Sequence, residues 1–370
     1  MPKIVHITSV HPAFDVRIFH KEAAELARSG YDVTLIAPHD RNQTIGGVKI
    51  KALPEPKSRI DRFWNLWRPI RLALAQRADI YHIHDPELVI PTIFLRIISR
   101  AKTVYDVHED VPKDILSKYW IPRWLRRPVA KAVGLMETMG VKAFDGVVAA
   151  TPAIARRFPH KKTVIVQNMP ILGELQPAKS SPYLERPHLI TYVGGISIIR
   201  CVNEIIQAID MLPEALNARL AMAGDFCPPG LETETRKSAD FKRVDFIGYQ
   251  SREKVANLLG QSRIGLVLFY PEANHIESQP NKLFEYMSVG LPVIASNFPL
   301  WREIVMGTGC GLVVDSLDPK AISRAIRDLL EDPQEALNMG QRGLNAIRTR
   351  YNWAIESQKL LDFYADRLAP

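Results

Sequence analysis

Two glutamates, Glu277 and Glu285, flank a short segment whose residue types suit the binding of an anion. Pro280 stands where a helix can begin and Gly290 where one ends, so the sequence predicts a helix over about residues 280–289. Glu277 lies just before this helix and Glu285 lies within it. Both carboxylates are therefore expected to line one cleft around whatever binds at the helix start.

The start of the predicted helix suits a phosphate group. A helix begins with amide groups that have no partner inside the helix, and its dipole favours negative charge there. Here those amides belong to Asn281, Lys282 and Leu283. A carboxylate is a poor neighbour for a phosphate, but it accepts hydrogen bonds from sugar hydroxyls on either side of one. Two glutamates around a diphosphate therefore fit a nucleotide-sugar; the alternative is an ordinary helix with exposed acids.

The segment that contains the second glutamate reads Lys-Leu-Phe-Glu-Tyr-Met-Ser-Val-Gly-Leu-Pro-Val-Ile-Ala-Ser. Together with Glu277 it resembles the E-x7-E signature of the retaining glycosyltransferases of family 4. That family has an α/β fold of the GT-B type, in which two Rossmann-like domains face a central cleft, and the likeness runs over nearly the whole chain. The resemblance implies that Glu277 faces the transferred sugar and that Glu285 binds the ribose.

Composition is that of a globular protein with two domains. The chain has 370 residues, 46% hydrophobic and 24% charged, which is too long for one ordinary core. No apolar stretch reaches the roughly 18 residues of a membrane span, and the amino terminus lacks a signal-peptide pattern. Three widely spaced cysteines form neither a disulfide framework nor a zinc site. A cytoplasmic protein is expected.

The first part of the chain has the order of a doubly wound sheet. Residues 3–10 alternate and are rich in β-forming types, residues 16–28 have helical spacing, and residues 32–37 form a second β-rich run. The G-x-G-x-x-G fingerprint of dinucleotide-binding proteins is missing, which disfavours an enzyme that uses a nicotinamide.

Prolines between residues 168 and 188 interrupt any periodicity, so we place the linker between the two domains there. By the resemblance, the domain over residues 1–168 binds the acceptor and the domain over residues 188–350 binds the nucleotide-sugar. The resemblance also implies that a last helix, within residues 351–370, packs back on the first domain.

Residues at the carboxyl ends of the first domain's strands are candidates for contact with the acceptor. The loop over residues 11–15 lacks the glycine pair that many members of the family have there. Asp15 and Arg17 are instead expected to meet the acceptor. The alternative is that Asp15 caps a helix and that Arg17 lies on the surface.

Three histidines lie in or after predicted strands. His82 and His84 share one face of a strand and have the spacing of a metal pair, but we find no third ligand at convincing spacing and no D-x-D motif, so no metal site is predicted. His108 follows the strand over residues 103–107 and matches the family histidine that lies beside the sugar and the acceptor. The alternative is that His108 only binds its own loop.

A pair of glycines after the first strand of the second domain begins the expected diphosphate site. The family commonly has an arginine and, five residues later, a lysine that hold the diphosphate; this chain has Gly195 and Arg200 at those positions. Lys282 is expected to compensate for the missing cation. The alternative is an exposed Arg200 with a structural role.

The expected reaction uses no metal ion and no cofactor. The leaving diphosphate is stabilised by Arg200, Lys282 and the helix amides, and the phosphate or His108 assists removal of the proton from the attacking hydroxyl. Catalytic roles are expected for His108, Glu277 and Arg200. Donor contacts are expected from Gly194, Gly195, Arg200, Glu277, Asn281, Lys282, Leu283 and Glu285, and acceptor contacts from Asp15, Arg17 and His108.

Positive charge is concentrated in residues 57–77 and 118–142. Each stretch holds six basic residues and one acid, against a net charge of +8 for the whole chain. Both stretches place tryptophan beside arginine, which suits the headgroup layer of an anionic membrane. The alternatives are helices that pack an apolar stripe inward, or a nucleic-acid surface; no recognised nucleic-acid fold accompanies them, so we expect no nucleic-acid partner.

The sequence thus predicts a retaining hexosyltransferase that uses a UDP- or GDP-linked sugar. Its expected acceptor is a lipid-linked or surface polysaccharide intermediate at the inner face of the cell membrane, where the protein would be peripheral. One alternative is a sugar-nucleotide epimerase of the same fold, for which His82, His84 and Glu109 are the available acid–base groups. The other is a non-catalytic protein that binds a sugar nucleotide.

Overall fold

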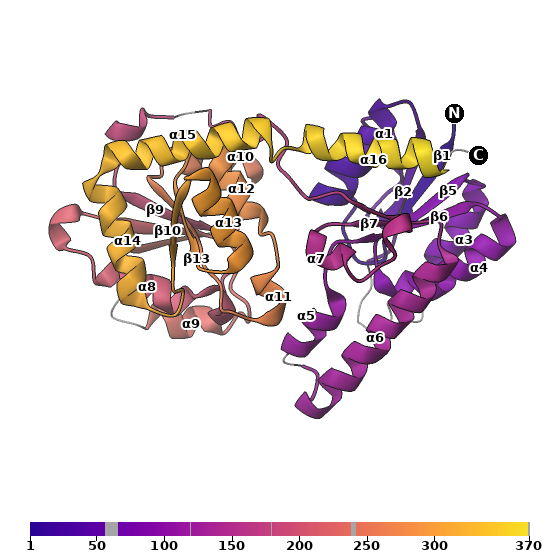
Figure 1. Cartoon of the computed structure of the whole chain (residues 1–370), viewed down its shortest axis with the longest axis horizontal. Helices are drawn as coiled ribbons and strands as arrows, with labels where there is room; N and C mark the ends of the chain where they lie inside the picture. Colours follow the sequence, from indigo (N-terminus) through magenta and orange to yellow (C-terminus); the bar gives the residue numbers. More distant parts are fainter. Residues whose placement is uncertain (56–65, 119, 179, 238–241, 369–370) are drawn as a thin grey trace. The chain divides into compact units, whose positions relative to one another are not determined.

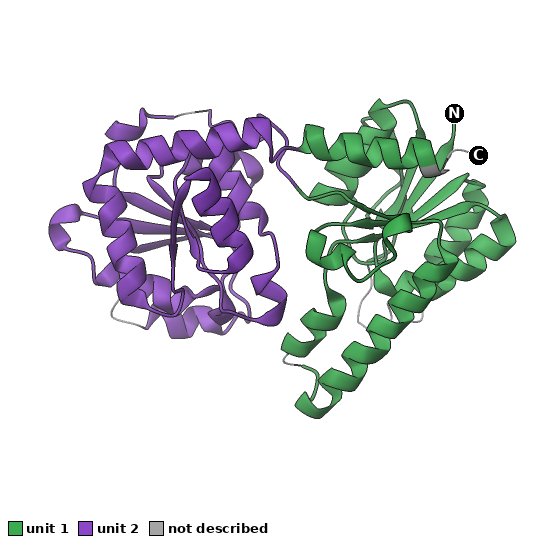
Figure 2. Cartoon of the chain, viewed as in Figure 1, with its two compact units in different colours: residues 1–168, 353–370 green, residues 169–352 purple. Residues whose placement is uncertain are grey.

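The computed structural model describes residues 1–55, 66–118, 120–178, 180–237 and 242–368 (Figure 1). The chain forms two compact units, and Figure 2 shows each in its own colour. Unit 1 consists of Met1–Asn168 and Trp353–Pro370, and unit 2 of Met169–Asn352.

The stretch that the sequence analysis treated as a linker belongs to unit 2. Met169, Leu175 and Tyr183 are buried in the core of that unit. The Tyr183 hydroxyl donates a hydrogen bond of 2.9 Å to the carbonyl of Arg263. The prolines of this stretch therefore lie in a segment that packs on unit 2 rather than in an open connection.

Unit 1 is built on an eight-stranded sheet with the order β3-β4-β2-β1-β5-β6-β7-β8. Every pairing is parallel except that of β3 with β4. The strands are β1 (Lys3–Ile7), β2 (Asp32–Pro38), β3 (Gln43–Ile45), β4 (Val48–Leu53), β5 (Ile80–Ile83), β6 (Lys102–Val107), β7 (Gly146–Ala149) and β8 (Thr163–Ile165).

The helices of unit 1 include one unusual segment. They are η1 (Val16–Ala23), α1 (Ala24–Arg28), α3 (Trp67–Gln76), η2 (Pro86–Leu88), α4 (Val89–Ser99), α5 (Val111–Ser117), α6 (Arg123–Ala143), α7 (Pro152–Ala155), η3 (His160–Lys162) and α16 (Trp353–Leu368). The sequence predicts one regular helix over residues 16–28, but η1 is a π-helix. The amide of His20 bonds to the carbonyl of Asp15, five residues back. Such turns are rare and are often found at functional sites.

Helix α16 packs on unit 1 although it follows unit 2 in sequence. The ring of Phe363 fills the place that a Cβ on Gly146 of β7 would occupy. The hydroxyl of Tyr364 lies 2.7 Å from Nδ1 of His82 in β5. These contacts assign the last helix to the core of unit 1.

Unit 2 is built on a six-stranded parallel sheet with the order β11-β10-β9-β12-β13-β14. Its strands are β9 (Leu189–Val193), β10 (Arg219–Ala223), β11 (Val244–Gly248), β12 (Ile264–Val267), β13 (Val293–Ser296) and β14 (Gly311–Val314). Its helices are η4 (Tyr183–Glu185), η5 (Ile198–Arg200), α8 (Val202–Asp210), η6 (Glu214–Leu216), α9 (Leu231–Arg236), α10 (Arg252–Leu259), α11 (Ala273–Ile276), α12 (Asn281–Ser288), α13 (Pro299–Thr308), α14 (Pro319–Glu331) and α15 (Pro333–Thr349).

Both units therefore have the predicted α/β architecture of a Rossmann-like sheet. In each sheet the strand order reverses next to the first strand, between β1 and β5 in unit 1 and between β9 and β12 in unit 2. Ligands of open parallel sheets bind beyond the carboxyl ends of the strands at this reversal. Binding residues are therefore expected at these two places.

Candidate functional site

In unit 2, two strand ends approach each other closely enough to require glycine. Gly194 follows β9 with φ of +123°, and Gly224 follows β10 with φ of +144°. A Cβ on Gly224 would overlap the carbonyl of Gly194. Glycine is therefore required here both by backbone conformation and by space. Because these glycines have no side chains, the turn does not cover the carboxyl end of β9.

Arg200 lies across this turn. Its Nη1 donates a hydrogen bond of 2.9 Å to the carbonyl of Gly195. A Cβ on Gly195 would lie 2.6 Å from the same Nη1, so the missing side chain provides the room that the guanidinium occupies. The glycine found where an arginine was expected thus allows Arg200 to reach the end of β9.

Lys282 brings a second cation to the same turn. Its Nζ lies 3.3 Å from the position of a Cβ on Gly194 and 3.6 Å from the centre of the Tyr192 ring. The side chain is buried, and within the described residues Nζ has no hydrogen-bond partner. Burial, and after it the charge of Arg200, lower the pKa of Lys282 well below its ordinary value. A buried amine without an acceptor is costly, and a phosphate oxygen would supply the acceptor.

The helix that supplies Lys282 differs slightly from the prediction. Helix α12 begins at Asn281, with Pro280 as its N-cap, and ends at Ser288. The amide of Leu283 donates a hydrogen bond of 3.1 Å to the carbonyl of Pro280. Leu283 is therefore removed from the predicted set of phosphate-binding amides, because its donor is already used within the first turn.

Glu285 is paired with an arginine that the sequence analysis did not identify. Nη1 of Arg252 donates a hydrogen bond of 2.6 Å to Oε1 of Glu285, and Nη2 of the same arginine binds Glu174 at 2.7 Å. The Glu285 side chain is largely buried. A ribose that binds Glu285 would have to share the carboxylate with Arg252 or displace it.

Glu277 lies in an ordered loop between α11 and α12. It is half-buried and caps the carboxyl end of α11. The next residue, Ser278, is held on both sides: its carbonyl accepts a hydrogen bond of 2.7 Å from Trp301, and its hydroxyl donates one of 2.9 Å to the carbonyl of His275. The fixed loop gives Glu277 a defined place beside the start of α12.

In unit 1, Asp15 has the structural role that was left open as an alternative. Its carboxylate accepts hydrogen bonds from the amides of Arg17, at 2.8 Å, and Ile18, at 2.9 Å, and so caps η1. Nδ1 of His11 lies 3.6 Å from the other oxygen. Burial alone would raise the pKa of Asp15, but the nearby His11 and the hydrogen bonds from the two amides lower it below its ordinary value.

Arg17 is neither at the surface nor placed to meet an acceptor, which corrects both sequence-based interpretations. Its side chain is buried and forms two hydrogen bonds to the Asp106 carboxylate, of 2.9 and 2.7 Å. A third, of 2.9 Å, goes to the carbonyl of Val166. The guanidinium therefore holds the ends of η1, β6 and β8 together inside unit 1.

His108 is oriented by the same carboxylate. Its Nδ1 lies 3.2 Å from Oδ2 of Asp106, and its Nε2 lies 3.1 Å from Nε2 of His11. Burial would raise the pKa of Asp106, but the charge of Arg17 and the hydrogen bonds of His108 and His84 hold it well below its ordinary value. An ionised Asp106 fixes a proton on Nδ1 of His108 and leaves Nε2 able to accept one. His108 therefore binds more than its own loop.

A cavity of about 1010 Å³ lies within unit 1 at the carboxyl ends of β1, β5 and β6. One part is polar, with His11, His108, Asp85 and Glu109 in its wall. The rest is lined mainly by apolar side chains, including Trp67, Ile90, Ile115, Trp120, Val133 and Met136. This volume accepts a molecule with one polar end and one apolar end.

The structure thus brings some predicted residues together and places others, such as Arg17, away from their predicted contact. Gly194, Gly195, Arg200 and Lys282 meet at one turn. Sequence reasoning missed Asp106, although it precedes His108 by two positions, and a strand places such residues on one face. It also missed Arg252, for which the sequence carries no local signal.

Comparisons with known proteins agree with this architecture. The family described as "Glycosyl transferases group 1" matches residues 177–346, and the one described as "Glycosyl transferase 4-like domain" matches residues 16–167. A GDP-mannose-dependent alpha-(1-6)-phosphatidylinositol monomannoside mannosyltransferase of Mycolicibacterium smegmatis is 25% identical over 190 residues. That match covers 47% of this chain and 49% of the relative, so the chain spans about half the length of this relative.

Two solved structures show the same fold. Sucrose-phosphate synthase from Thermosynechococcus elongatus superimposes with a TM-score of 0.77 and 18% identity, covering 99% of this chain and 98% of the other. HepE from Anabaena, solved in complex with UDP and glucose, gives a TM-score of 0.75 and 13% identity, covering 99% of this chain and 100% of the other. At these identities the likeness concerns the fold alone.

Replacement of Lys282 by methionine is expected to stabilise the free protein and to weaken the binding of a nucleoside diphosphate. Methionine fills a similar volume without a buried amine, so the free energy of unfolding should rise by about 1 kcal/mol. Thermal unfolding with and without UDP or GDP measures both effects.

The control for this variant is Lys320→Met, because Lys320 is exposed on α14. It should leave the melting temperature and the nucleotide response close to those of the wild type. A Lys282→Met protein that is less stable than the wild type, yet still fully stabilised by nucleotide, would contradict the assignment.

Proposed function

We propose that this chain, which belongs to the family-4 glycosyltransferases of the GT-B fold, transfers a hexose from a nucleoside-diphosphate sugar to an acceptor that carries a lipid. The turn at Gly194 is the observation that supports a nucleoside-diphosphate sugar as the donor. Arg200 and Lys282 converge on it, and Lys282 is buried with no acceptor within the described residues. A diphosphate supplies the negative charge and the acceptor oxygens that this arrangement lacks.

The transfer needs negative charge to be stabilised as the donor is cleaved. The bond between the anomeric carbon and the β-phosphate oxygen breaks, and a bond from the acceptor oxygen to that carbon forms on the same face, with retention of configuration. Arg200, Lys282 and the first amides of α12 stabilise the leaving diphosphate. The proton of the acceptor hydroxyl passes to the leaving phosphate or to Nε2 of His108. We assign Glu277 to the transferred sugar and Glu285 to the ribose.

The cavity of unit 1 supports an acceptor with an apolar part. Its polar wall, with His108 and Glu109, suits a sugar or phosphate head, and its apolar wall suits a hydrocarbon chain. A polysaccharide acceptor without a lipid would leave the apolar wall unused. We therefore favour a lipid-linked acceptor over a free glycan.

An exposed apolar surface lies next to this cavity on α3, α4 and α6, and we call it the apolar face. Its members are Trp67, Ile90, Phe94, Ile97, Ile98, Leu135 and Met139. Helix α4 contacts both α3 and α6 (Figure 1). The rings of Trp67 and Phe94 lie 5.7 Å apart. Trp67 and Ile90 also line the cavity, so the apolar face is continuous with it.

The two basic stretches are only partly as predicted. In α3, Ile70 is buried and Leu74 half-buried, so this part of the stripe packs inward, whereas Trp67, Arg68 and Arg71 are exposed. In the second stretch Trp120, Arg123, Trp124 and Arg127 are exposed. Residues 57–65, with Phe63 and Trp64, and residue 119 lie outside the described residues.

We propose that the apolar face and these arginines dock on an anionic bilayer. None of the helices in the described ranges is long and apolar enough to cross a membrane. Exposed aromatic and aliphatic side chains beside arginines suit the interface between headgroups and acyl chains. Docking there would bring the cavity to the layer from which a lipid-linked acceptor is taken.

The donor site is tested by thermal unfolding with UDP, GDP, ADP and CDP. A ligand at 100 times its dissociation constant stabilises a protein by about 2.7 kcal/mol, which is readily seen as a rise in melting temperature. One nucleotide should stabilise the wild type, and Glu285→Ala should lose most of this effect. Glu174→Ala is the control, because it removes the other partner of Arg252 and leaves Glu285 in place. Stabilisation by no nucleotide would remove the main support for the proposal.

The role of Glu277 is tested by turnover with the nucleotide-sugar that the panel selects. A hydrogen bond to a charged group contributes roughly 1.5–3 kcal/mol, so Glu277→Ala should reduce kcat by about one to two powers of ten. Glu303→Ala, which changes an exposed acid on α13, should retain the wild-type rate. An unchanged kcat in Glu277→Ala would exclude the assigned role.

Membrane docking is tested by sedimentation with vesicles of phosphatidylglycerol and phosphatidylcholine. Ile97 is 70% exposed, so Ile97→Glu should leave the fold intact. It should reduce the bound fraction about tenfold, because a charge replaces an apolar contact, and added salt should weaken wild-type binding. Met306→Glu, on α13 of unit 2, is the matched control and should bind as the wild type does. Equal binding by the wild type, Ile97→Glu and Met306→Glu would rule out the apolar face as the docking surface.

A further inference from the structure

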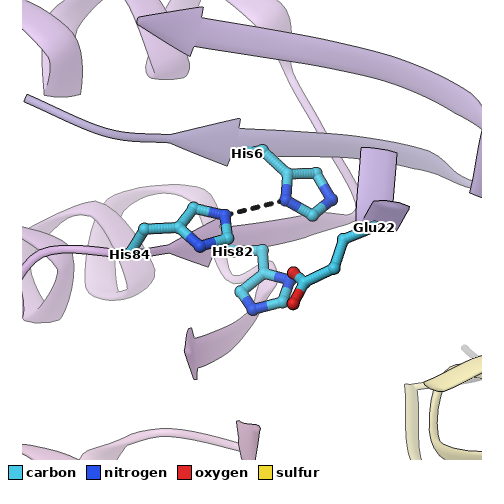
Figure 3. A group of neighbouring side chains, drawn as sticks. All are labelled: His6, Glu22, His82 and His84. Carbon is cyan, nitrogen blue, oxygen red and sulfur yellow. Dashed lines mark hydrogen bonds between the residues drawn. The ribbon is translucent and has the colours of Figure 1, made fainter. Parts of the chain in front are cut away.

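A cluster of buried side chains in unit 1 has no part in the proposed transfer. It consists of His6, Glu22, His82 and His84, all buried (Figure 3). One potential ligand atom of each lies within 4.8 Å of the others. These residues come from three separate segments of the chain, so their meeting is a property of the fold.

The strand register brings the histidines together. His6 of β1 is the direct partner of His82 in the parallel pairing of β1 with β5. His84 follows His82 by two positions and lies on the same face. Glu22 comes from η1, the π-helical segment, and its carboxylate lies beside the His82 ring in Figure 3.

The hydrogen bonds of the cluster decide where its protons lie. The ionised carboxylate of Asp106 can only accept, so His84, with Nδ1 at 3.0 Å from it, must donate from that atom. Both His84 and His6 are buried, and burial disfavours the charged form of an imidazole ring. Nε2 of His84 is therefore an acceptor, and Nδ1 of His6, at 2.9 Å, is its donor. Nε2 of His6 is left with a lone pair.

The remaining groups of the cluster also include polar atoms without a hydrogen-bond partner. Within the described residues, Nε2 of His6, Nε2 of His82 and both oxygens of Glu22 have no hydrogen-bond partner. Glu22 forms a buried ion pair with Arg17, with Nη2 at 3.0 Å from Oε1, although the geometry is not that of a hydrogen bond. Nδ1 of His82 lies 2.7 Å from the hydroxyl of Tyr364, and when this nitrogen donates to the hydroxyl, Nε2 of His82 also has a lone pair. Buried polar atoms that face one another without hydrogen bonds are costly and require an explanation.

We propose that His6, His82 and Glu22 bind a divalent transition-metal ion such as Zn²⁺. Imidazole nitrogens and carboxylate oxygens are ligands of this ion, and each of the three residues offers one such atom. His84 and Asp106 form the outer layer that fixes the tautomer of His6, as is usual for metal-bound histidines. The competing explanation is a proton on Glu22, but one proton can pair only one of the facing acceptors.

A metal ion here would join β1, β5 and η1, and through His82 and Tyr364 it would also hold α16. Its effect would be on the stability of unit 1, since binding to the folded state alone adds directly to the free energy of unfolding. The site is separate from the diphosphate site of unit 2 and does not depend on the proposed transfer.

The proposal is tested on the full chain, unfolded with a chelator and refolded with Zn²⁺ or Co²⁺. After gel filtration, the protein should retain about one metal ion per chain by mass spectrometry, and its melting temperature should exceed that of protein refolded without metal. The Co²⁺ protein should show visible absorption bands of nitrogen and oxygen ligation. Glu22→Gln and His82→Gln should retain less than about a tenth of the wild-type metal.

The matched control is His160→Gln, because His160 is exposed and far from the cluster in sequence. It should retain metal as the wild type does. No retained ion in the wild type, or equal retention in the cluster variants, would overturn the proposal. If the variants do not fold, two measurements on the wild type decide. Absence of the bands of imidazole ligation from the Co²⁺ protein would overturn the proposal. An infrared band of a protonated Glu22 carboxyl group that stays unchanged when metal is added would overturn it as well.

Discussion

The parallel direction of the strands is the constraint on which the rest of this protein depends. Because all parallel strands of a sheet end at one edge, the residues that follow them meet there whatever their distance in sequence. In unit 1 this brings His11 and His108 within hydrogen-bonding distance. In unit 2 it brings Lys282 to the turn at Gly194. Both groupings lie where the strand order reverses.

Polar groups without partners also gather at these reversals. A folded interior normally satisfies its buried donors and acceptors, so the exceptions indicate something other than stability. Among the described residues, the exceptions include the amine of Lys282 in unit 2 and atoms of His6, His82 and Glu22 in unit 1. We propose an anion as the ligand of the first group and a cation as the ligand of the second. One architecture would then serve ligands of opposite charge in the two units.

The sequence predicted the sheets better than it predicted the contacts between side chains. The strands predicted over residues 32–37 and 103–107 are found as β2 and β6, each within one residue of those limits, because β-forming residues predominate there. The π-helical form of η1 was missed, since helical spacing alone does not reveal a shift to bonds over five residues. Lys282 and Gly194 were identified from local patterns. Arg252 and Asp106 were not, because their partners come from distant segments that only the folded chain brings near.

The return of the last helix to unit 1 has a consequence for the order in which the protein is made. Unit 2 is continuous in sequence, whereas unit 1 is completed by residues 353–370. A ribosome therefore releases every residue of unit 2 before it supplies Phe363 to cover Gly146 or Tyr364 to bind His82. Domains usually fold in the order of their synthesis. Here the unit that begins the chain is the last to be finished.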